Sequence, residues 1–247
     1  MNVSANTLFH FTDKKEVLKG ILKDSFYPKY SLEDLGNVIP DSKNITVHIP
    51  MVCFCDLVFS QIIPHIDFYG DYGIGLRKKG WGIQKGISPI IYVPKEAMSA
   101  TLIQEIRVQL KSLMMKDENE ILEKQIPDFF KYIKAYEGLG QNKRTRKMEF
   151  KPFYDEREWR YSPMKFRVYS EKLVPDETLK RENDKMKKQE KLTFEGKDVK
   201  YIIVKDEDEI PEFVDFIERT LKNRFTKAET KILVSKLISV EQIRDDM

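Results

Sequence analysis

The sequence has few cysteines, few histidines and no long apolar run. Cys53 and Cys55 are the only cysteines in 247 residues, and on one strand they would lie too close together and too similarly oriented for an ordinary disulfide. This is typical of a reducing compartment, so we expect a cytoplasmic protein. No segment approaches the roughly 20 consecutive apolar residues that span a bilayer. The N-terminus has no basic stretch followed by an apolar run, so we expect neither a signal peptide nor a membrane partner.

The chain also lacks a strong excess of charge of one sign. Charged residues make up 34% of it, yet the net charge is only +3. This balance indicates a solvated surface rather than a protein that coats nucleic acid, although it is compatible with a local basic groove. An apolar fraction of 41% is enough for a substantial core. Neither an internal repeat nor a linker is visible, so we predict a single α+β domain over residues 1–247.

Several common motifs are missing. The sequence contains no Walker loop and no zincin helix, and the Tyr-Gly-Ile-Gly segment at 72–75 lacks the third glycine and the following helix of a dinucleotide-binding turn. The three histidines are scattered and the cysteines have Cys-x-Cys spacing, so we expect no metal site. A cysteine nucleophile is a weaker alternative than inert packing, because a free cysteine on a buried strand usually only fills space.

Hydrophobic periodicity predicts the main elements. Strands are predicted over 7–12, 52–56, 69–76, 89–93, 149–162 and 199–204, and helices over 13–24, 96–116, 118–136 and 208–223. Thr12 or Asp13 is predicted to cap the first of these helices.

The remaining segments are less regular. We interpret 26–50 as a loop with short regular pieces and the basic stretch 138–148 as a loop. We interpret 57–65 as a helical turn closed by Pro64, and 232–238 as a late strand or helix. The predicted domain thus carries a helical insert at about 96–136 and a charged segment at about 176–192, the latter a solvated helix or a mobile insertion.

Two predicted strands carry polar side chains on one face and aromatic side chains on the other. Because successive side chains on a strand point to opposite faces, His10 and Thr12 share one face of the first strand. Glu156, Glu158 and Arg160 likewise share one face of the second. If these two polar faces meet, they form a cleft that contains a histidine, a hydroxyl, two acids and an arginine.

Each part of this cleft also has a plain structural interpretation. His10 alone could be a buried structural histidine, but it lies just before a predicted helix N-terminus, whose free N–H groups favour a phosphate. We therefore expect His10 and Thr12 to flank a pyrophosphate or a ribose. The Glu156–Arg160 row could be a solvent-facing ladder of salt bridges at a sheet edge. Partial burial of two carboxylates two residues apart would instead raise the pKa of at least one, as a functional site requires.

The same residues carry a resemblance to a known family. The Phe9–Thr12 run, the segment from Pro50 to Leu57, the stretch from Tyr69 to Leu76 and the late Glu-Arg-Glu-Trp-Arg of 156–160 together resemble the AbiGi family of bacterial abortive-infection proteins. This resemblance covers most of the chain. It implies phage defence, and it implies an antitoxin-like partnership with a second protein.

A looser resemblance is to ADP-ribosyltransferase folds, including the DarT type, which also open with a strand-borne histidine and threonine and close with a glutamate on a late strand. It implies a split antiparallel or mixed β-sheet core with flanking helices and a helical insertion, and it implies NAD as cofactor without a metal. His10 would then hold the nicotinamide ribose and amide with Thr12 beside it, and Tyr69 or Tyr72 would stack on the nicotinamide. The remaining implied roles are catalysis by Glu158 or Glu156 and pyrophosphate pairing, or support of the glutamates, by Arg160.

The resulting functional hypothesis is an ADP-ribosyltransferase-like enzyme of phage defence, which modifies a nucleic acid or protein acceptor or only hydrolyses NAD. The alternative is a non-catalytic antitoxin or regulator that binds a partner toxin, with the charged 180–191 segment and the C-terminal helices as its surface. A nucleotide sensor without turnover is a third option. The sequence predicts neither the acceptor nor the oligomeric state.

Overall fold

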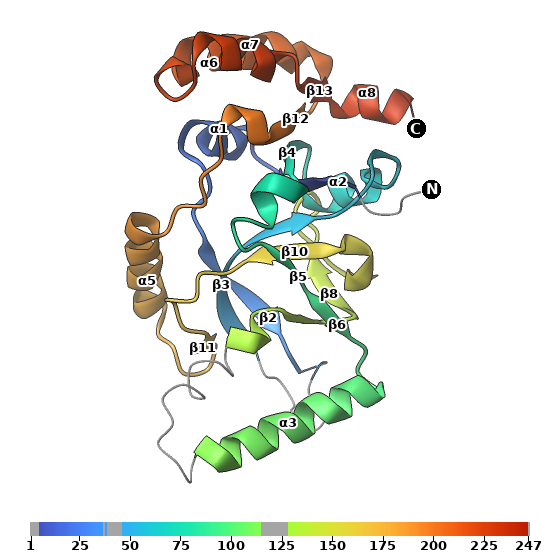
Figure 1. Ribbon diagram of the computed structural model, residues 1–247. Helices are drawn as coiled ribbons and strands as arrows, with labels where there is room; N and C mark the ends of the chain where they lie inside the picture. Colours follow the sequence, from blue (N-terminus) through green and yellow to red (C-terminus); the bar gives the residue numbers. More distant parts are fainter. Residues whose placement is uncertain (1–4, 37, 39–45, 115–127, 247) are drawn as a thin grey trace.

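A nine-stranded sheet forms the centre of the protein. The computed structural model describes residues 5–36, 38, 46–114 and 128–246. The main sheet has the order β13-β12-β4-β1-β3-β10-β5, with β2 and β11 also paired to β3 (Figure 1). Its strands are β1 (Thr7–Thr12), β2 (Lys29–Asp34), β3 (Thr46–Cys55), β4 (Tyr72–Arg77), β5 (Ser88–Pro89), β10 (Glu158–Tyr161), β11 (Tyr169–Ser170), β12 (Val199–Val204) and β13 (Leu237–Ser239).

This sheet opens between β1 and β3. β1 pairs with β4 along all six of its residues, whereas its register with β3 is the single pair Phe9↔Cys55. β3 instead pairs with β2 over Lys29–Asp34 and with β10 over Glu158–Tyr161. The sheet therefore consists of two halves, β13-β12-β4-β1 and the strands around β3, that are joined at one point and separate beyond it (Figure 1).

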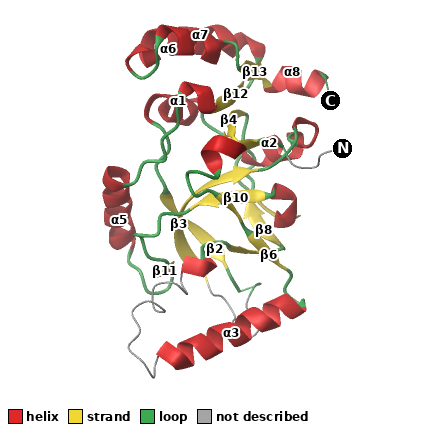
Figure 2. Ribbon diagram, in the orientation of Figure 1, coloured by secondary structure: helices red, strands yellow, loops and turns green. Residues whose placement is uncertain are grey.

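Helices cover the half that contains β1. They are α1 (Lys15–Asp24), α6 (Ile210–Thr220), α7 (Lys227–Val234) and α8 (Val240–Asp245), with the short α2 (Ile63–Tyr69) beside β1 (Figure 2). α1 forms because its apolar residues recur at helical spacing, and Leu18 and Leu22 are fully buried against the sheet. They join a core cluster with Ile74 of β4, Ile202 of β12 and Phe213 of α6.

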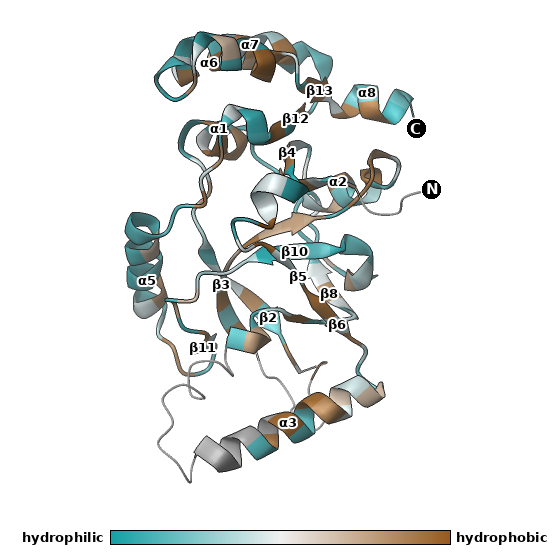
Figure 3. Cartoon of the chain, in the orientation of Figure 1, coloured by the Kyte–Doolittle hydropathy of each residue, from teal (hydrophilic) through white to brown (hydrophobic). Residues whose placement is uncertain are grey.

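The other half carries smaller elements. β6 (Ile91–Val93) and β7 (Ile133–Ala135) form a parallel pair, β8 (Glu137–Gln141) and β9 (Met148–Pro152) form a hairpin, and α5 (Asp176–Gln189) packs beside β2. Figure 3 shows α5 as an almost wholly hydrophilic helix, which matches the predicted charged segment. α3 (Met98–Met114) extends along the end of the molecule opposite α6 and α7 (Figure 1). Among the described residues, no helix is long and apolar enough to cross a membrane.

The mixed α+β class is confirmed, and so are several elements. The strands 7–12 and 199–204 match their predicted bounds, and the first helix begins two residues later than predicted. The predicted helix 96–116 is confirmed as α3. The second predicted helix, 118–136, is wrong at its end, because 133–135 is a strand that pairs with β6; its residues 118–127 lie outside the described part of the chain.

Other predictions of local structure were wrong for identifiable reasons. The 26–50 segment contains β2 and the start of β3, which pair with each other despite weak alternation. The 138–148 segment contains strand residues of the β8–β9 hairpin. The 57–65 segment does contain a helical turn, the 3₁₀ turn Phe59–Gln61, but Pro64 does not close it. Pro64 is the second residue of α2, because proline is tolerated in the first helical turn, where no N–H partner is lost. The first residue before α1 is Lys14, and no side chain caps this helix, so neither Thr12 nor Asp13 has the predicted role.

Candidate functional site

A cavity lies where the two halves of the sheet separate. Its volume is about 820 Å³, and it is lined from both halves, by residues that include His10, Phe26, Cys53, Tyr69, Glu156 and Glu158. Because β1 and β3 do not continue their pairing beyond Phe9↔Cys55, side chains from both strands reach this space. The opening of the sheet is thus what brings the first and the late polar segments to one site.

His10 lies at the gap itself. Its Nδ1 is 2.8 Å from the backbone carbonyl oxygen of Cys53, and its ring packs against Phe26 and Phe54 at centroid distances of 5.2 and 5.8 Å. A carbonyl oxygen only accepts, so Nδ1 carries the hydrogen and Nε2 is left as an acceptor. Burial lowers the pKa of His10, against a smaller opposing effect of the Cys53 hydrogen bond. The imidazole is therefore neutral at pH 7.

Glu158 and Arg160 lie on the other face of the same sheet. In the β10–β3 register Glu158 is opposite Cys55 and Arg160 is opposite Cys53, so these four side chains share a face, while His10 packs with Phe54 on the reverse face. The polar faces of the two strands, whose meeting the sequence left open, therefore do not face each other directly. His10 and Glu158 nevertheless both line the cavity at the gap in the sheet.

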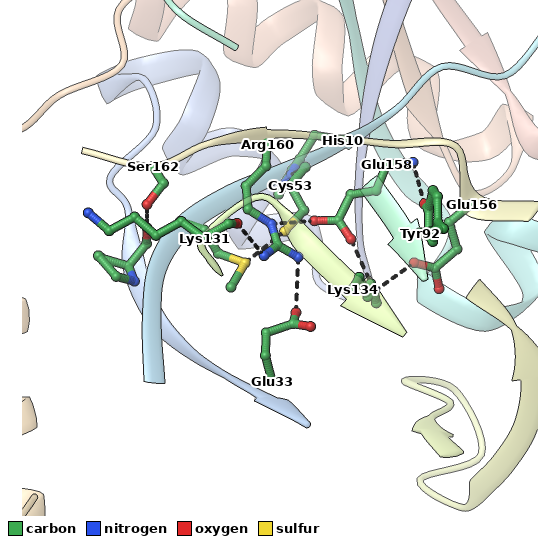
Figure 4. Close-up of polar contacts among 12 residues, drawn as sticks. His10, Glu33, Cys53, Tyr92, Lys131, Lys134, Glu156, Glu158, Arg160 and Ser162 are labelled. Atoms are coloured by element: carbon green, nitrogen blue, oxygen red, sulfur yellow. Dashed lines mark hydrogen bonds and ion pairs between the residues drawn. The ribbon is translucent and has the colours of Figure 1, made fainter. Parts of the chain in front are cut away.

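Glu156 reaches the same place by a different route. It is the last residue of a 3₁₀ turn, Phe153–Glu156, and Arg157 after it has a left-handed backbone with φ 46°. The predicted strand 149–162 is interrupted there, so Glu156 and Glu158 do not share a strand face. Their carboxylates still converge, because both bind Lys134: its Nζ lies 2.9 Å from Glu156 Oε2 and 3.0 Å from Glu158 Oε2 (Figure 4).

The carboxylates belong to a buried ionic network. Arg160 is fully buried, donates from Nε to Glu158 at 2.8 Å, and contacts Glu33 at 3.1 Å (Figure 4). Lys151 lies 3.0 Å from the second oxygen of Glu156, to which the Tyr69 hydroxyl also donates. Only 4% of Glu156 and 5% of Glu158 is exposed. These exposures exclude the solvent-facing ladder that the sequence left open.

The network keeps both cavity carboxylates ionised. Burial acts to raise the pKa of Glu156, but Lys134 and Lys151 outweigh it and lower that pKa below its ordinary value. Burial likewise opposes ionisation of Glu158, and Arg160 and Lys134 outweigh it, so its pKa is also lowered. The sequence predicted at least one raised pKa instead. Of these three cations it identified only Arg160, as a support of the glutamates or a pyrophosphate ligand. Two buried, ionised carboxylates are suited to stabilising positive charge on a ligand, not to donating a proton.

The other predicted site residues divide into two groups. Tyr69 lines the cavity, and its ring packs against that of His65 at a centroid distance of 4.5 Å and an interplanar angle of 37°. Thr12 and Tyr72 do not line it. The Thr12 hydroxyl is 3.4 Å from the backbone N of Lys14, and the Tyr72 hydroxyl donates to Glu209 at 2.9 Å on the α6 side of the sheet.

Sequence patterns identified Arg160 but missed the two lysines and one acid of this site. Lys134 lies in a three-residue strand inside a segment predicted to be helical, Lys151 lies on the hairpin strand β9, and Glu33 lies in the segment interpreted as a loop. No spacing pattern connects residues so far apart in the chain. Burial raises the thiol pKa of both Cys53 and Cys55, so neither is a ready nucleophile. Within the described ranges, no group of three or more His, Cys, Asp or Glu side chains is arranged to hold a metal ion.

Comparison with known proteins gives one family. The family model described as "Putative abortive phage resistance protein AbiGi, antitoxin" matches residues 24–205. The chain is also similar to a protein of Lactococcus lactis subsp. cremoris named abortive phage resistance protein AbiGi, with 28% identity over 252 aligned positions that cover 90% of this chain and 99% of the relative. No solved structure gives a significant match.

Proposed function

The chain belongs to the AbiGi family of abortive phage resistance proteins, and we propose that it acts in phage defence as an ADP-ribosyltransferase-like enzyme that binds NAD in the cavity between β1 and β3. The observation that carries this proposal is the pair of buried, ionised carboxylates of Glu156 and Glu158 on the wall of a cavity that His10 and Tyr69 also line. The opening of the sheet at Phe9↔Cys55 supports the split-sheet architecture of such enzymes.

The size of the cavity fits a dinucleotide. Ligand sites in proteins typically measure about 300–1,000 Å³, and this one measures about 820 Å³. Its wall is also chemically divided, with the aromatic rings of Phe26 and Phe54 near His10 and the ion pairs at the carboxylates. An aromatic end suits a nicotinamide or adenine ring, and the carboxylates suit the ribose bonded to it.

The chemistry needs one glycosidic bond to break. The bond between ribose C1′ and the nicotinamide nitrogen breaks, nicotinamide leaves with the electron pair, and positive charge develops on the ribose. Glu158, with Glu156 as the alternative, stabilises that charge, because a preorganised carboxylate in a dry site interacts strongly with a developing cation. A hydroxyl or amino group of a nucleic acid or protein acceptor, or water, then bonds to C1′ and loses its proton.

The other cavity residues bind and orient the ligand. The free Nε2 of His10 accepts a hydrogen bond from the ribose or the carboxamide, and Tyr69 supplies a ring for stacking. Arg160 supports the glutamates instead of pairing with a pyrophosphate, since its guanidinium is fully buried against Glu158, Glu33 and the backbone carbonyl of Lys131.

Expression in cells tests this proposal. Induction of the wild-type protein alone should lower cellular NAD or slow growth, and a protein with both Glu156→Gln and Glu158→Gln should do neither at the same expression level. The pairing of the two substitutions is needed because the structure places both carboxylates on Lys134. Growth arrest and NAD loss by the double variant would reject the proposal.

A second candidate is the antitoxin role that the family description names. In that role the protein would bind and silence a partner toxin, through the charged helix α5 and the C-terminal helices α6 to α8. Co-expression distinguishes the two candidates: an enzyme is harmful alone, whereas an antitoxin is harmless alone and restores growth to cells that express the toxin encoded beside it. NAD binding without turnover would favour the nucleotide sensor.

A further inference from the structure

Lys134 is placed differently from the other cations of the site. Lys151 contacts Glu156 and Arg160 contacts Glu158, whereas Lys134 contacts both carboxylates, at 2.9 and 3.0 Å. It comes from β7, in the small parallel sheet with β6, and so joins that sheet to the 3₁₀ turn and to β10. Figure 4 shows its ammonium group between the two glutamates.

The surroundings of Lys134 hold it in that position. Its side chain is 12% exposed, and its Nζ lies 4.5 Å from the centre of the Phe153 ring, a favourable cation–π contact. Separation of Lys134 from either carboxylate would leave an unpaired buried charge, which costs several kcal/mol. The ion pairs therefore hold the lysine and both carboxylates in place.

We propose that Lys134 is a positioning residue of the site, which holds Glu156 and Glu158 side by side at the cavity wall and balances their charge together. The proposal deepens the proposed function and rests on it only for the identity of the ligand. Without Lys134, two like charges would lie close together in a poorly solvated place, and one carboxyl would take up a proton at a pH where it is now ionised.

Other charged and titratable groups also face the pair. They are Lys151 of β9, Arg160 of β10, Glu33 of β2, Tyr92 of β6, Cys53 and Cys55 of β3, and Tyr69 and His65 of α2. Lys151 provides the matched control, because it is a lysine that contacts Glu156 and lines the same ionic network without an ion pair to Glu158.

The test is a titration of the glutamate side-chain carboxyl signals by ¹³C NMR in the full-length protein, with Glu156→Gln and Glu158→Gln used for assignment. Lys134→Met should raise the titration midpoints of both carboxyls, by about one pH unit or more. Lys151→Met should move that of Glu156 and leave that of Glu158 unchanged, and Lys134→Arg should keep both near the wild-type values. If Lys134→Met does not fold, Lys134→Gln, which keeps a hydrogen-bond donor without the charge, takes its place.

Two results would overturn the proposal. In the first, Lys134→Met leaves the titration midpoints of both carboxyls unchanged. In the second, Lys134→Met shifts only the midpoint of Glu156, and by as much as Lys151→Met does. A second measurement connects Lys134 to activity. The acid limb of the pH profile of nicotinamide release should move to higher pH in Lys134→Met and return in Lys134→Arg. If the wild-type protein releases no nicotinamide, the proposed function fails, while the NMR titration still decides the role of Lys134.

Discussion

The imidazole Nδ1–H of His10 donates to the backbone carbonyl of Cys53 across 2.8 Å, at the position where β1 leaves β3. This hydrogen bond links the two halves of the sheet after their backbone pairing has ended. It also fixes the tautomer of His10, because the carbonyl takes the Nδ1 hydrogen and leaves Nε2 as an acceptor. One residue thus joins the architecture of the cavity to its chemistry.

Two substitutions of His10 separate these roles. His10→Ala removes both nitrogens, whereas His10→Asn retains an amide N–H that can donate to Cys53 and lacks the second ring nitrogen. We expect both variants to bind NAD about tenfold more weakly, since one hydrogen bond to the ligand is lost. Isothermal titration calorimetry measures this. Wild-type affinity in His10→Asn would mean that His10 only holds the strands together.

We predict that the protein loses stability in mild acid because of His65. Burial lowers the pKa of His65 to about 4, from its ordinary 6.5. Between these pH values His65 is therefore protonated in the unfolded chain and neutral in the folded protein. The stability of the folded protein falls as the pH drops through this window. The effect of this one residue is at most about 1.4 kcal/mol per pH unit.

Urea denaturation at pH 7, 5.5 and 4.5 measures this effect in the wild type and in His65→Gln. The free energy of unfolding of the variant should fall less steeply over the upper part of the window, where Glu156 and Glu158, whose pKa values are lowered, remain ionised. Equal slopes in the two proteins would show that His65 takes up its proton as readily when folded as when unfolded.

We predict that position 70 accepts only glycine. Its φ is +126°, and a Cβ built there would lie 2.4 Å from the Thr12 carbonyl oxygen and the Asp13 Cα. Gly70→Ala should therefore cost about 3 kcal/mol of stability, from backbone strain and overlap together. Thermal or chemical unfolding gives the value.

Gly20 is the matched control for this substitution. It lies inside helix α1, and a Cβ there would meet nothing within 4 Å. Gly20→Ala should stabilise the protein by about 0.5–1 kcal/mol, because alanine loses less backbone entropy than glycine in a helix. A similar effect of both substitutions would contradict the tight approach of α2 to the end of β1.

Sequence patterns predicted the helices and strands that form because of the periodicity of their own residues, rather than because of contacts with distant segments. The strands 7–12 and 199–204 and the helix α1 have clear periodicity, and each was found close to its predicted bounds. Glu156, Glu158 and Arg160 were identified as a group because they are neighbours in the chain, and they do form a group. The prediction that all three share one face of a strand was wrong for Glu156, because the left-handed backbone of Arg157 interrupts the strand between the two glutamates.

What the sequence could not predict depends on contacts between distant segments. Lys134 reaches the carboxylates from a strand of three residues, too short to give a periodic signal, and its pairing with β6 decides its position. The lowered pKa values of Glu156 and Glu158 follow from that lysine and from Arg160 and Lys151. The gap between β1 and β3 depends on which strand each one pairs with, and no local pattern encodes that choice.

The most direct test of the central claim is nicotinamide release from NAD by the purified protein, measured by chromatography for the wild type beside Glu158→Gln. Folding of both is checked by circular dichroism, because Gln keeps the shape of the side chain and can still accept from Arg160. We predict release by the wild type and its loss in the folded Glu158→Gln variant, with Glu156→Gln deciding which carboxylate acts at C1′. Undiminished release by the variant that carries both substitutions would contradict the account, as would a wild-type protein that neither binds nor cleaves NAD.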